Sequence, residues 1–232
     1  MAKEEYKPQS VLVIGSRGSG KSTLIKEWVQ QHKKNFKDRM YLISPTALLD
    51  STLSDLVPKN HVFTEYSDAI VDEILKTVEE FHTRQEYDFY YKEVRMEDGD
   101  TATVERKHTK EELKKGPPKA HFLLLLDDIL GMVKAKSKIN FLFTRHRHYK
   151  LSLVFISQNY KGVPPIVRNN TSIYLLSGSL NRSELQKIAD EHSRQDTPKE
   201  FVENFVALAD KQKPYQFLEL DYTKHPVKLC TF

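Results

Sequence analysis

Short apolar runs alternate with longer amphipathic segments along most of the chain. A continuous apolar run that ends at a glycine, a proline or a polar pair is typical of a strand buried on both faces. A segment whose apolar residues recur every three or four positions is typical of a helix with one buried face. The pattern predicts strands at 10–14, 40–44, 61–64, 122–126, 151–157, 172–176 and 215–220. It predicts helices from residue 21 onward and over about 67–93, 129–143, 183–192 and 198–210.

Strands that alternate with helices in this way imply an α/β protein with a mostly parallel central sheet and helices on both faces. A single domain over residues 1–232 explains the pattern better than two domains do. It is interrupted at about 92–119, where apolar residues are rare and charges dense. We interpret that segment as a mobile surface insertion.

Composition narrows the class further. The chain has 232 residues, enough to bury a core without a metal or a disulfide. Its only cysteine, Cys230, excludes an internal disulfide and a cysteine-based zinc cluster. The longest apolar stretch is far shorter than the ~20 residues that span a bilayer, and the first residues lack the apolar core of a signal peptide. We therefore expect a soluble protein of a reducing compartment, not secreted and without a membrane segment.

The first candidate for chemistry is the segment 15–22, whose sequence GSRGSGKS matches the P-loop pattern G-x-x-x-x-G-K-[ST]. It follows a predicted strand and opens a predicted helix, where backbone N–H groups can cradle phosphate. Lys21 can reach the β- and γ-phosphates of a nucleotide, and the Ser22 hydroxyl can bind Mg²⁺. The alternative is a glycine-rich turn, which requires neither the lysine nor the hydroxyl. The predicted nucleotide-binding residues are Gly15, Ser16, Arg17, Gly18, Ser19, Gly20, Lys21, Ser22 and Thr23.

Two acidic residues follow the strand at 122–126. Asp127 can hold Mg²⁺ through water, together with Ser22. Asp128 can orient and polarise an attacking water. The alternative is a strand that ends in two solvated aspartates or in a helix cap. A second acid at this position suits a hydrolase better than a kinase, which directs its chemistry at a substrate hydroxyl.

Gln158 and Arg147 lie beyond the two ends of the strand at 151–157. Gln158 is expected at the P-loop edge of the sheet, where it could sense the γ-phosphate, or could be an ordinary polar loop residue. Arg147 is expected at the opposite edge, badly placed for its own nucleotide but well placed to serve a neighbouring subunit as an arginine finger. It could instead be a solvated arginine in a basic turn, and Arg145, Arg168 and Arg182 are rival fingers.

The charge balance excludes a strongly basic protein. Lysine plus arginine number 36 and aspartate plus glutamate 32, a formal net charge of +4, so any basic surface must be local. A basic stretch without acidic residues runs from 134 to 150. It could contact a nucleic-acid backbone without reading sequence, or it could be a charged helix face kept in water. The candidate DNA contacts are Lys134, Lys136, Lys138, Arg145 and Lys150.

Taken together, these motifs resemble the FtsK/HerA superfamily. They are the P-loop, the strand that ends Asp-Asp, the run RHYKLSLVFISQ at 147–158 and the run PPIVRNN at 164–170. Within the superfamily the chain is most similar to the DNA-packaging ATPases of large double-stranded DNA viruses, namely the poxvirus-type enzymes and their relatives in giant viruses and virophages. The resemblance runs from about residue 11 to residue 188.

The resemblance implies a P-loop NTPase of the additional-strand, RecA-like type that uses ATP and Mg²⁺ to thread double-stranded DNA into a preformed capsid. It implies that Asp127 and Asp128 serve Mg²⁺ and water, Gln158 is the sensor and Arg147 the finger in trans. It also implies a ring of identical subunits, a pentamer or a hexamer, with capsid vertex proteins as partners. The place of action would be the host cytoplasm, the viral assembly site or the virion. Much of the superfamily has glutamate at the position of Asp128.

Two other functions are compatible with the nucleotide motifs. A P-loop phosphotransferase acting on a nucleoside or a nucleotide would need a lid with arginines, and it has no clear use for Asp128. A nucleotide-dependent assembly or switch protein would bind nucleotide with little turnover. Neither of them requires a ring.

Overall fold

The computed structural model describes residues 6–95, 101–105, 108–117, 119–193, 197–209, 215–224 and 229–231. By its internal contacts the chain divides into two compact units. The first comprises residues 1–68 and 121–232, and the second comprises residues 69–120. The whole of the predicted insertion at 92–119 belongs to the second unit.

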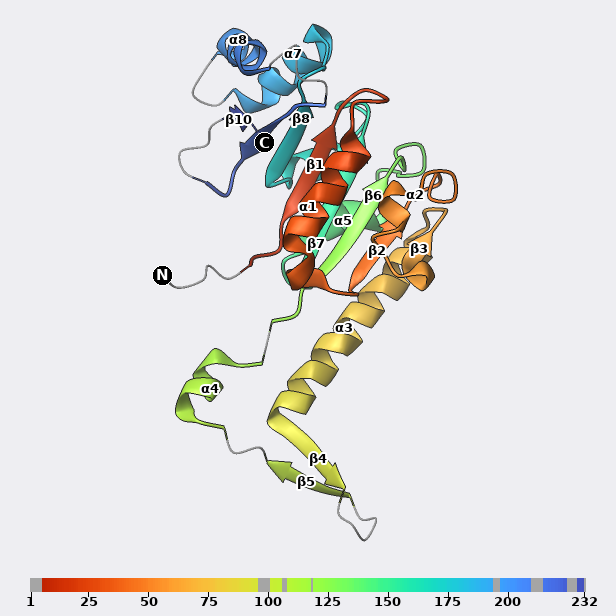
Figure 1. Ribbon diagram of the computed structural model, residues 1–232, viewed down its shortest axis with the longest axis vertical. Coiled ribbons are helices and arrows are strands. Elements are labelled where there is room, and N and C mark those ends of the chain that lie inside the picture. Colours follow the sequence, from red (N-terminus) through yellow and green to blue (C-terminus); the bar gives the residue numbers. More distant parts are fainter. Residues whose placement is uncertain are drawn as a thin grey trace. The chain divides into compact units, whose positions relative to one another are not determined.

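A single sheet forms the centre of the first unit (Figure 1). Its described strands are β1 (Ser10–Ile14), β2 (Met40–Ile43), β3 (Val62–Phe63), β6 (Phe122–Asp127), β7 (Leu151–Ser157), β8 (Ile173–Ser177), β9 (Phe217–Asp221) and β10 (Leu229–Thr231). Their order across the sheet is β10-β9-β8-β1-β7-β6-β2-β3. Neighbours from β8 to β3 are parallel, whereas β9 and β10 pair antiparallel at one edge. The predicted mostly parallel sheet is confirmed.

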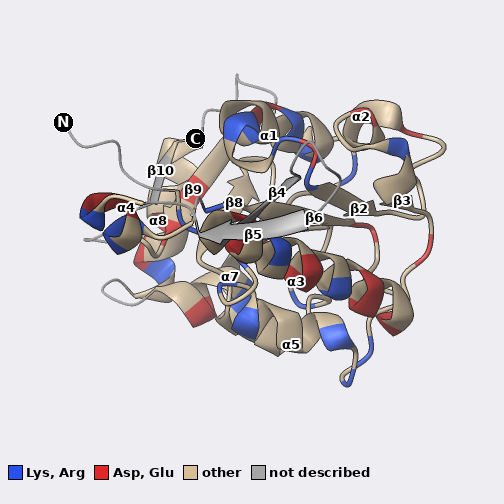
Figure 2. Cartoon of the chain, turned by 90° about the horizontal axis from the view of Figure 1, so that it is seen from below, with Lys and Arg blue, Asp and Glu red and all other residues tan. Residues whose placement is uncertain are grey.

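Helices cover both faces of this sheet, as predicted. On one face α1 (Lys21–Phe36) packs Trp28 and its other apolar residues into a core cluster with alternate residues of β1, β6 and β7. On the other face α5 (Lys138–Arg145) places the ring of Phe143 with its centroid 6.2 Å from that of Phe155 in β7. Figure 2 shows α1 and α5 on opposite sides of the strands. Because both faces are covered, the central strands are apolar at nearly every position.

The remaining helices of the first unit are short, and three of them are capped by side chains. They are α2 (Ser51–Ser54), the 3-10 helix η1 (Lys59–His61), α6 (Pro165–Asn169), α7 (Arg182–His192) and α8 (Pro198–Leu208). The Asn181 side chain accepts a hydrogen bond from the Glu184 N–H at the start of α7. Thr197 and Glu200 form a capping box at the start of α8. Pro198 occupies the first turn of that helix, as predicted.

The second unit has regular structure of its own. It contains α3 (Asp68–Tyr90) from its second residue onward, the antiparallel pair β4 (Tyr91–Arg95) and β5 (Thr101–Glu105), and α4 (Lys110–Lys115). The ring of His108 stacks on that of Phe89, with centroids 4.2 Å apart. The predicted insertion at 92–119 thus includes regular elements. Residues 96–100, 106–107 and 118 lie outside the described residues, and the mobility of the segment stays a prediction.

Two predictions about element boundaries are wrong. The helix expected over 129–143 exists only from Lys138, because side chains bind the preceding backbone groups. Ser137 Oγ accepts from the Lys134 N–H at 2.8 Å, and Asn140 Nδ2 donates to the carbonyl oxygens of Lys134 and Ala135 at 2.8 and 3.1 Å. The strand expected at 215–220 is β9, which begins two residues later, at Phe217, and it pairs with β10, a strand that was not predicted. Within the described ranges, no helix combines the length and the apolar character that crossing a bilayer requires.

A buried ion pair joins α6 to α7. The guanidinium of Arg168 contacts both carboxylate oxygens of Glu191, and its Nε donates to the carbonyl oxygen of Val163 at 3.1 Å. The Arg168 side chain is only 8% exposed and that of Glu191 28%. Burial raises the pKa of Glu191, but hydrogen bonds from Lys161, Tyr160 and Arg168 outweigh burial and lower it from 4.5 to about 2.

We expect Glu191→Gln to lower the free energy of unfolding by about 1.5–3 kcal/mol near pH 7, because the amide leaves the buried Arg168 without a charged partner. The Glu191 pKa is lower in the folded state, so this stabilisation is complete above a pH of 4.5 and is lost as the pH falls toward 2. Urea denaturation at several pH values measures it. Glu203→Gln, in the exposed pair with Lys199, is the control and should stay near wild type. Equal losses in the two variants would contradict the prediction.

Candidate functional site

The P-loop is the turn that connects β1 to α1, and its shape depends on glycine. Gly18 and Gly20 have φ values of +75° and +87°, which residues with a side chain rarely adopt. Gly15 lies in a tight space, where an added Cβ would come within 2.5 Å of Ser19 Oγ and 2.8 Å of Ser177 Cβ. The glycines predicted for this loop therefore serve two needs, a left-handed backbone and a close approach between neighbouring strands.

Lys21 folds back over this loop. Its ammonium donates hydrogen bonds to the carbonyl oxygens of Gly15 and Ser16, each at 2.9 Å. Burial lowers the pKa of Lys21, while the charges of Asp127 and Asp128 act in the opposite direction. The first turn of α1 contains no acidic residue, so the partial positive charge of the helix start is not neutralised by its own side chains. A lysine ammonium and the start of a helix at the same loop are suited to binding phosphate.

The remaining predicted residues of the loop differ in exposure. Ser16, Arg17 and Thr23 are exposed, and Ser22 is half-buried at the start of α1. Ser19 is buried, and its hydroxyl has no hydrogen-bond partner among the described residues. A buried hydroxyl without a partner is costly, which is consistent with a site that binds a polar ligand.

Asp127 ends β6 and lies beside β2. Its Oδ2 accepts a hydrogen bond from Ser44 Oγ at 3.2 Å, and Ser44 Oγ lies 3.1 Å from Thr46 Oγ1. Burial raises the pKa of Asp127, whereas the Ser44 hydrogen bond and the charge of Lys21 lower it. Ser44 was not among the site residues predicted from the sequence. The sequence feature that could have indicated Ser44 is its place as the last polar residue of the predicted strand at 40–44, directly before Pro45.

Asp128 and Gln158 are both exposed at the same edge of the sheet. Asp128 has a φ of +53°, so the chain turns sharply away from the strand there. Gln158 follows β7 directly, and the Gly15 N–H donates to the carbonyl oxygen of the preceding Ser157 at 3.2 Å. The start of the P-loop is thereby tied to the backbone next to Gln158.

The strand order explains why these residues converge. β7 lies between β1 and β6, and all three are parallel. Ile14 pairs with Ser157, and Asp127 pairs with Ile156, so the three strands end almost level. The structure therefore brings together the P-loop, Asp127, Asp128 and Gln158.

The donors at this edge fit Mg²⁺. The half-buried Ser22 hydroxyl and the Asp127 carboxylate are hard oxygen ligands of the kind that Mg²⁺ prefers. Within the described residues, no group of three or more His, Cys, Asp or Glu side chains could hold an ion by themselves. Such a sparse donor set suits an ion that completes its coordination with phosphate oxygens and water.

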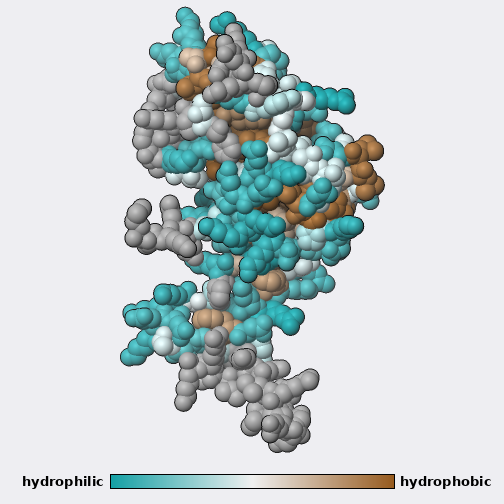
Figure 3. Space-filling model, in the orientation of Figure 1, coloured by the Kyte–Doolittle hydropathy of each residue, from teal (hydrophilic) through white to brown (hydrophobic). Residues whose placement is uncertain are grey.

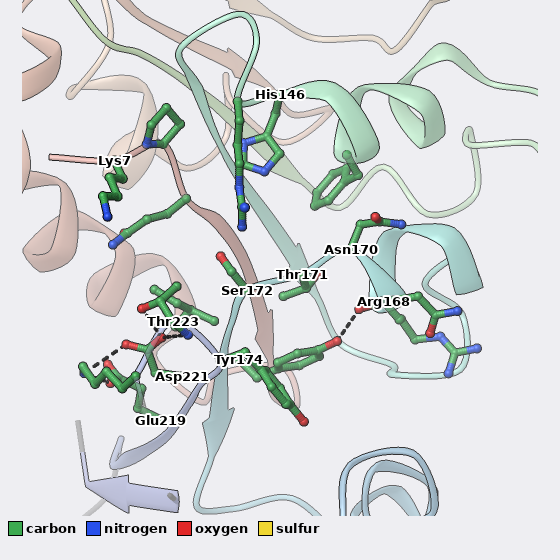
Figure 4. Close-up of a pocket in the computed structure, with 18 of the residues that line it drawn as sticks. Lys7, His146, Arg168, Asn170, Thr171, Ser172, Tyr174, Glu219, Asp221 and Thr223 are labelled. Atoms are coloured by element: carbon green, nitrogen blue, oxygen red, sulfur yellow. Dashed lines mark hydrogen bonds and ion pairs between the residues drawn. The ribbon is translucent and has the colours of Figure 1, made fainter. Parts of the chain in front are cut away.

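Arg147 lies at the opposite edge of the sheet, as predicted. It is exposed in the turn between α5 and β7, and it lines an open groove whose other residues include those labelled in Figure 4. The seven residues of β7 separate it from Gln158 by about 20 Å. It is therefore out of reach of a nucleotide bound to its own P-loop.

The rival arginines have other positions. Arg168 is engaged by Glu191 inside its own subunit and is not available to a neighbour. Arg182 begins α7 after β8, which places it at the P-loop edge. Arg145 is exposed at the end of α5, close in sequence to Arg147. Among the candidates that the sequence named, Arg145 and Arg147 thus remain as exposed arginines at the far edge.

The predicted DNA contacts do not form one patch. Lys134 and Lys136 are exposed in the turns after Asp127, and Lys138 is exposed at the start of α5. Arg145 ends that helix, and Lys150 is half-buried beside the start of β7. The basic stretch therefore divides into a group at the P-loop edge and a group at the opposite edge, joined by α5.

Comparison with protein families gives one match. The family model of the poxvirus A32 protein matches residues 3–220 of the chain. None of the curated proteins compared with the chain matches it significantly.

Solved structures share the fold. The DNA-packaging ATPase B204 from Sulfolobus Turreted Icosahedral Virus has a TM-score of 0.62 and 18% identity, covering 97% of this chain and 98% of that one. The genome packaging NTPase B204 from Sulfolobus turreted icosahedral virus 2, in complex with AMPPCP, has a TM-score of 0.59 and 19% identity over the same shares. EssC (ATPases 2 and 3) from Geobacillus thermodenitrificans has a TM-score of 0.52 and 13% identity, covering 96% of this chain and 39% of that one. The predicted P-loop NTPase fold is confirmed.

We expect Gly15→Ala to destabilise the protein by about 1–3 kcal/mol, because its Cβ would overlap Ser19 and Ser177. Gly18→Ala is the control, since an added Cβ meets nothing within 4 Å and only the left-handed backbone costs free energy, about 1–2 kcal/mol. Urea denaturation measures both. Adding Ser19→Ala should recover part of the loss in the Gly15 variant and none in the Gly18 variant. If adding Ser19→Ala recovers stability in neither variant, the close approach at Gly15 is relieved in some other way.

Proposed function

The chain belongs to the poxvirus A32 protein family, and from this premise we propose that it is a Mg²⁺-dependent ATPase that moves double-stranded DNA. The task we infer is the packaging of a viral genome into a preformed capsid, at a viral assembly site in the host cytoplasm, with capsid vertex proteins as partners. The observation that carries the proposal is the convergence of Lys21, Asp127 and Gln158 on one edge, with Arg147 on the other. The similar B204 structures are those of a DNA-packaging ATPase and a genome packaging NTPase, which supports the proposal.

ATP would bind with its phosphates on the P-loop. Lys21 would exchange the carbonyl oxygens of Gly15 and Ser16 for β- and γ-phosphate oxygens, and the N–H groups at the start of α1 would point at the same oxygens. Ser22 and Asp127 would hold Mg²⁺, which neutralises charge on the phosphates. The Ser44 hydrogen bond would keep the Asp127 carboxylate oriented toward that position.

Hydrolysis needs a water in line with the γ-phosphate. Asp128 is exposed next to Asp127 and can accept a proton from that water at its carboxylate. Gln158 is exposed one strand away and can hold the water or contact the γ-phosphate through its amide. The two side chains would thus divide proton acceptance and positioning between them.

A second subunit would complete this site. Charge develops on the γ-phosphoryl oxygens during transfer, and an arginine aimed at them stabilises it. Arg147 lies about 20 Å from its own Gln158, so it can do this only for a neighbour, as happens around a closed ring. Leu48 and Leu49 are 84% and 89% exposed in the turn after β2, where Figure 3 shows hydrophobic side chains at the surface. Such an apolar surface beside the nucleotide edge suits contact with the next subunit.

The DNA would be held loosely. Three exposed cations follow Asp127 closely along the chain, namely Lys134, Lys136 and Lys138. The segment that contains them is therefore directly connected to the nucleotide edge. Contacts between lysine and the phosphate backbone do not depend on the base sequence. A motor that slides along DNA requires contacts of this kind. We propose these three lysines as the principal DNA contacts, with Arg145 and Lys150 as lesser ones at the opposite edge.

Phosphate release tests the function. We expect the wild-type chain to hydrolyse ATP with Mg²⁺ and to be stimulated by double-stranded DNA, and Lys21→Ala to lose turnover because the phosphates lose their cation. Circular dichroism of the Lys21 variant is the control for folding. Phosphate transfer to an added nucleoside would indicate a phosphotransferase instead, and nucleotide binding without turnover would indicate a switch protein.

Mixing two inactive variants tests the trans arginine. We expect Arg147→Ala to reduce turnover at least about tenfold while sparing nucleotide binding, because the arginine acts in the transition state. Mixed with Asp128→Asn, it should regain activity, since some interfaces then combine an intact Asp128 with a neighbour's intact Arg147. Arg145→Ala, assayed without DNA, is the matched control and should retain most of its activity, because Arg145 is proposed only as a lesser DNA contact. If the mixture regains no activity, the proposal that Arg147 acts on the nucleotide of a neighbouring subunit is wrong.

A further inference from the structure

Tyr215 lies at the nucleotide edge of the sheet although neither the P-loop nor the acidic strand contains it. It comes two residues before β9, whose first residue Phe217 pairs with Ser177 at the end of β8. The Gly178 N–H donates to the carbonyl oxygen of Gln216 at 2.8 Å, which ties this turn to the end of β8. Because β8 is the neighbour of β1, the turn stands beside the P-loop.

The aromatic ring rests on the P-loop itself. A Cβ added to Gly20 would lie 3.0 Å from Tyr215 Cδ1 and 3.3 Å from its Cγ. The contact thus depends on the absence of a side chain at Gly20. Yet Tyr215 is 69% exposed, so the contact covers only a small part of its surface.

The backbone of Tyr215 is in an unfavourable conformation. Its φ is +70°, in the left-handed region that bulky residues avoid. Strained residues of this kind concentrate at functional sites, where the surrounding structure enforces them. An exposed ring on a strained backbone brings little stability to the fold, so its position calls for another explanation.

The direction in which a nucleotide would lie across the P-loop explains the position of Tyr215. In the proposed site the γ-phosphate faces Asp127 and Gln158, which belong to strands on one side of β1. Tyr215 belongs to the turn before β9, on the other side of β1. A nucleotide that runs across the P-loop therefore has its γ-phosphate toward Asp127 and Gln158 and its base toward Tyr215. Among the exposed large hydrophobic residues in the described part of the chain, Tyr215 is the aromatic one in contact with this loop.

We propose that Tyr215 is the stacking surface for the adenine base of ATP. The inference rests on the proposed ATPase function and assigns the base-binding part of that site. Every purine offers a flat π-face, so a tyrosine ring fixed at the loop would hold the base by stacking without reading its edge groups. It would therefore raise affinity for nucleoside triphosphates over bare triphosphate.

Binding of ATP and of inorganic tripolyphosphate tests this role. Titration calorimetry in the presence of Mg²⁺ would compare the full-length wild type with Tyr215→Ala, Tyr215→Leu and Tyr215→Phe. We expect the alanine and leucine variants to bind ATP about 5- to 100-fold more weakly, because base–aromatic stacking is lost. The phenylalanine variant keeps the ring and should bind ATP like wild type. Tripolyphosphate has no base and should bind all four proteins equally.

The two ligands separate the possible failures. Unchanged ATP affinity in Tyr215→Ala would overturn the stacking role and leave the ATPase proposal intact. Equal losses for ATP and tripolyphosphate would show that Tyr215 only supports the P-loop backbone, which also overturns stacking. A wild-type protein that binds neither ligand would overturn the stacking role and the proposed function together.

Discussion

The parallel pairing of β1, β7 and β6 is the constraint on which the rest of the molecule depends. These strands are buried on both faces and paired in register, and their carboxyl ends are nearly level. The P-loop and Gln158 follow two of these strands and Asp127 ends the third, so the pairing itself brings the proposed phosphate-binding, sensing and metal-binding groups together. The hydrogen bond from the Gly15 N–H to the Ser157 carbonyl oxygen extends this alignment by one step into the loop.

The same pairing also keeps Arg147 away. A parallel strand sends whatever precedes it to one edge of the sheet and whatever follows it to the other, so the residues on the two sides of β7 are separated by its whole length. In the proposed arrangement, a single chain thus presents the nucleotide site at one edge and Arg147 at the opposite edge. A closed ring of subunits would join two such edges in every interface. A modest formal charge of +4 is compatible with this proposal, because the proposed DNA-contacting cations are local and would recur in each subunit.

The sequence predicted the framework well because the framework depends on local signals. Apolar runs predicted β1, β6 and β7 almost to the residue, and the P-loop pattern placed Lys21. It failed where a few polar contacts decide the outcome. Ser137 and Asn140 bind backbone groups that a longer helix before Lys138 would have used. Ser44 reaches Asp127 across 83 positions of the chain, and its place at the end of a predicted strand does not by itself indicate that contact.

The residues with a left-handed backbone at the nucleotide edge are of two kinds, glycines and residues whose side chain has a proposed role. Gly18 and Gly20 take left-handed conformations at little cost, which suffices where only the backbone contacts phosphate. Asp128 and Tyr215 take similar conformations with a side chain present, although glycine would be less strained at both positions. Aspartate tolerates this region better than most residues, and tyrosine does not. In the proposed site, this strain would be retained because a carboxylate and a ring have to be presented to the ligand, which would tie the shape of these two turns to the chemistry of the site.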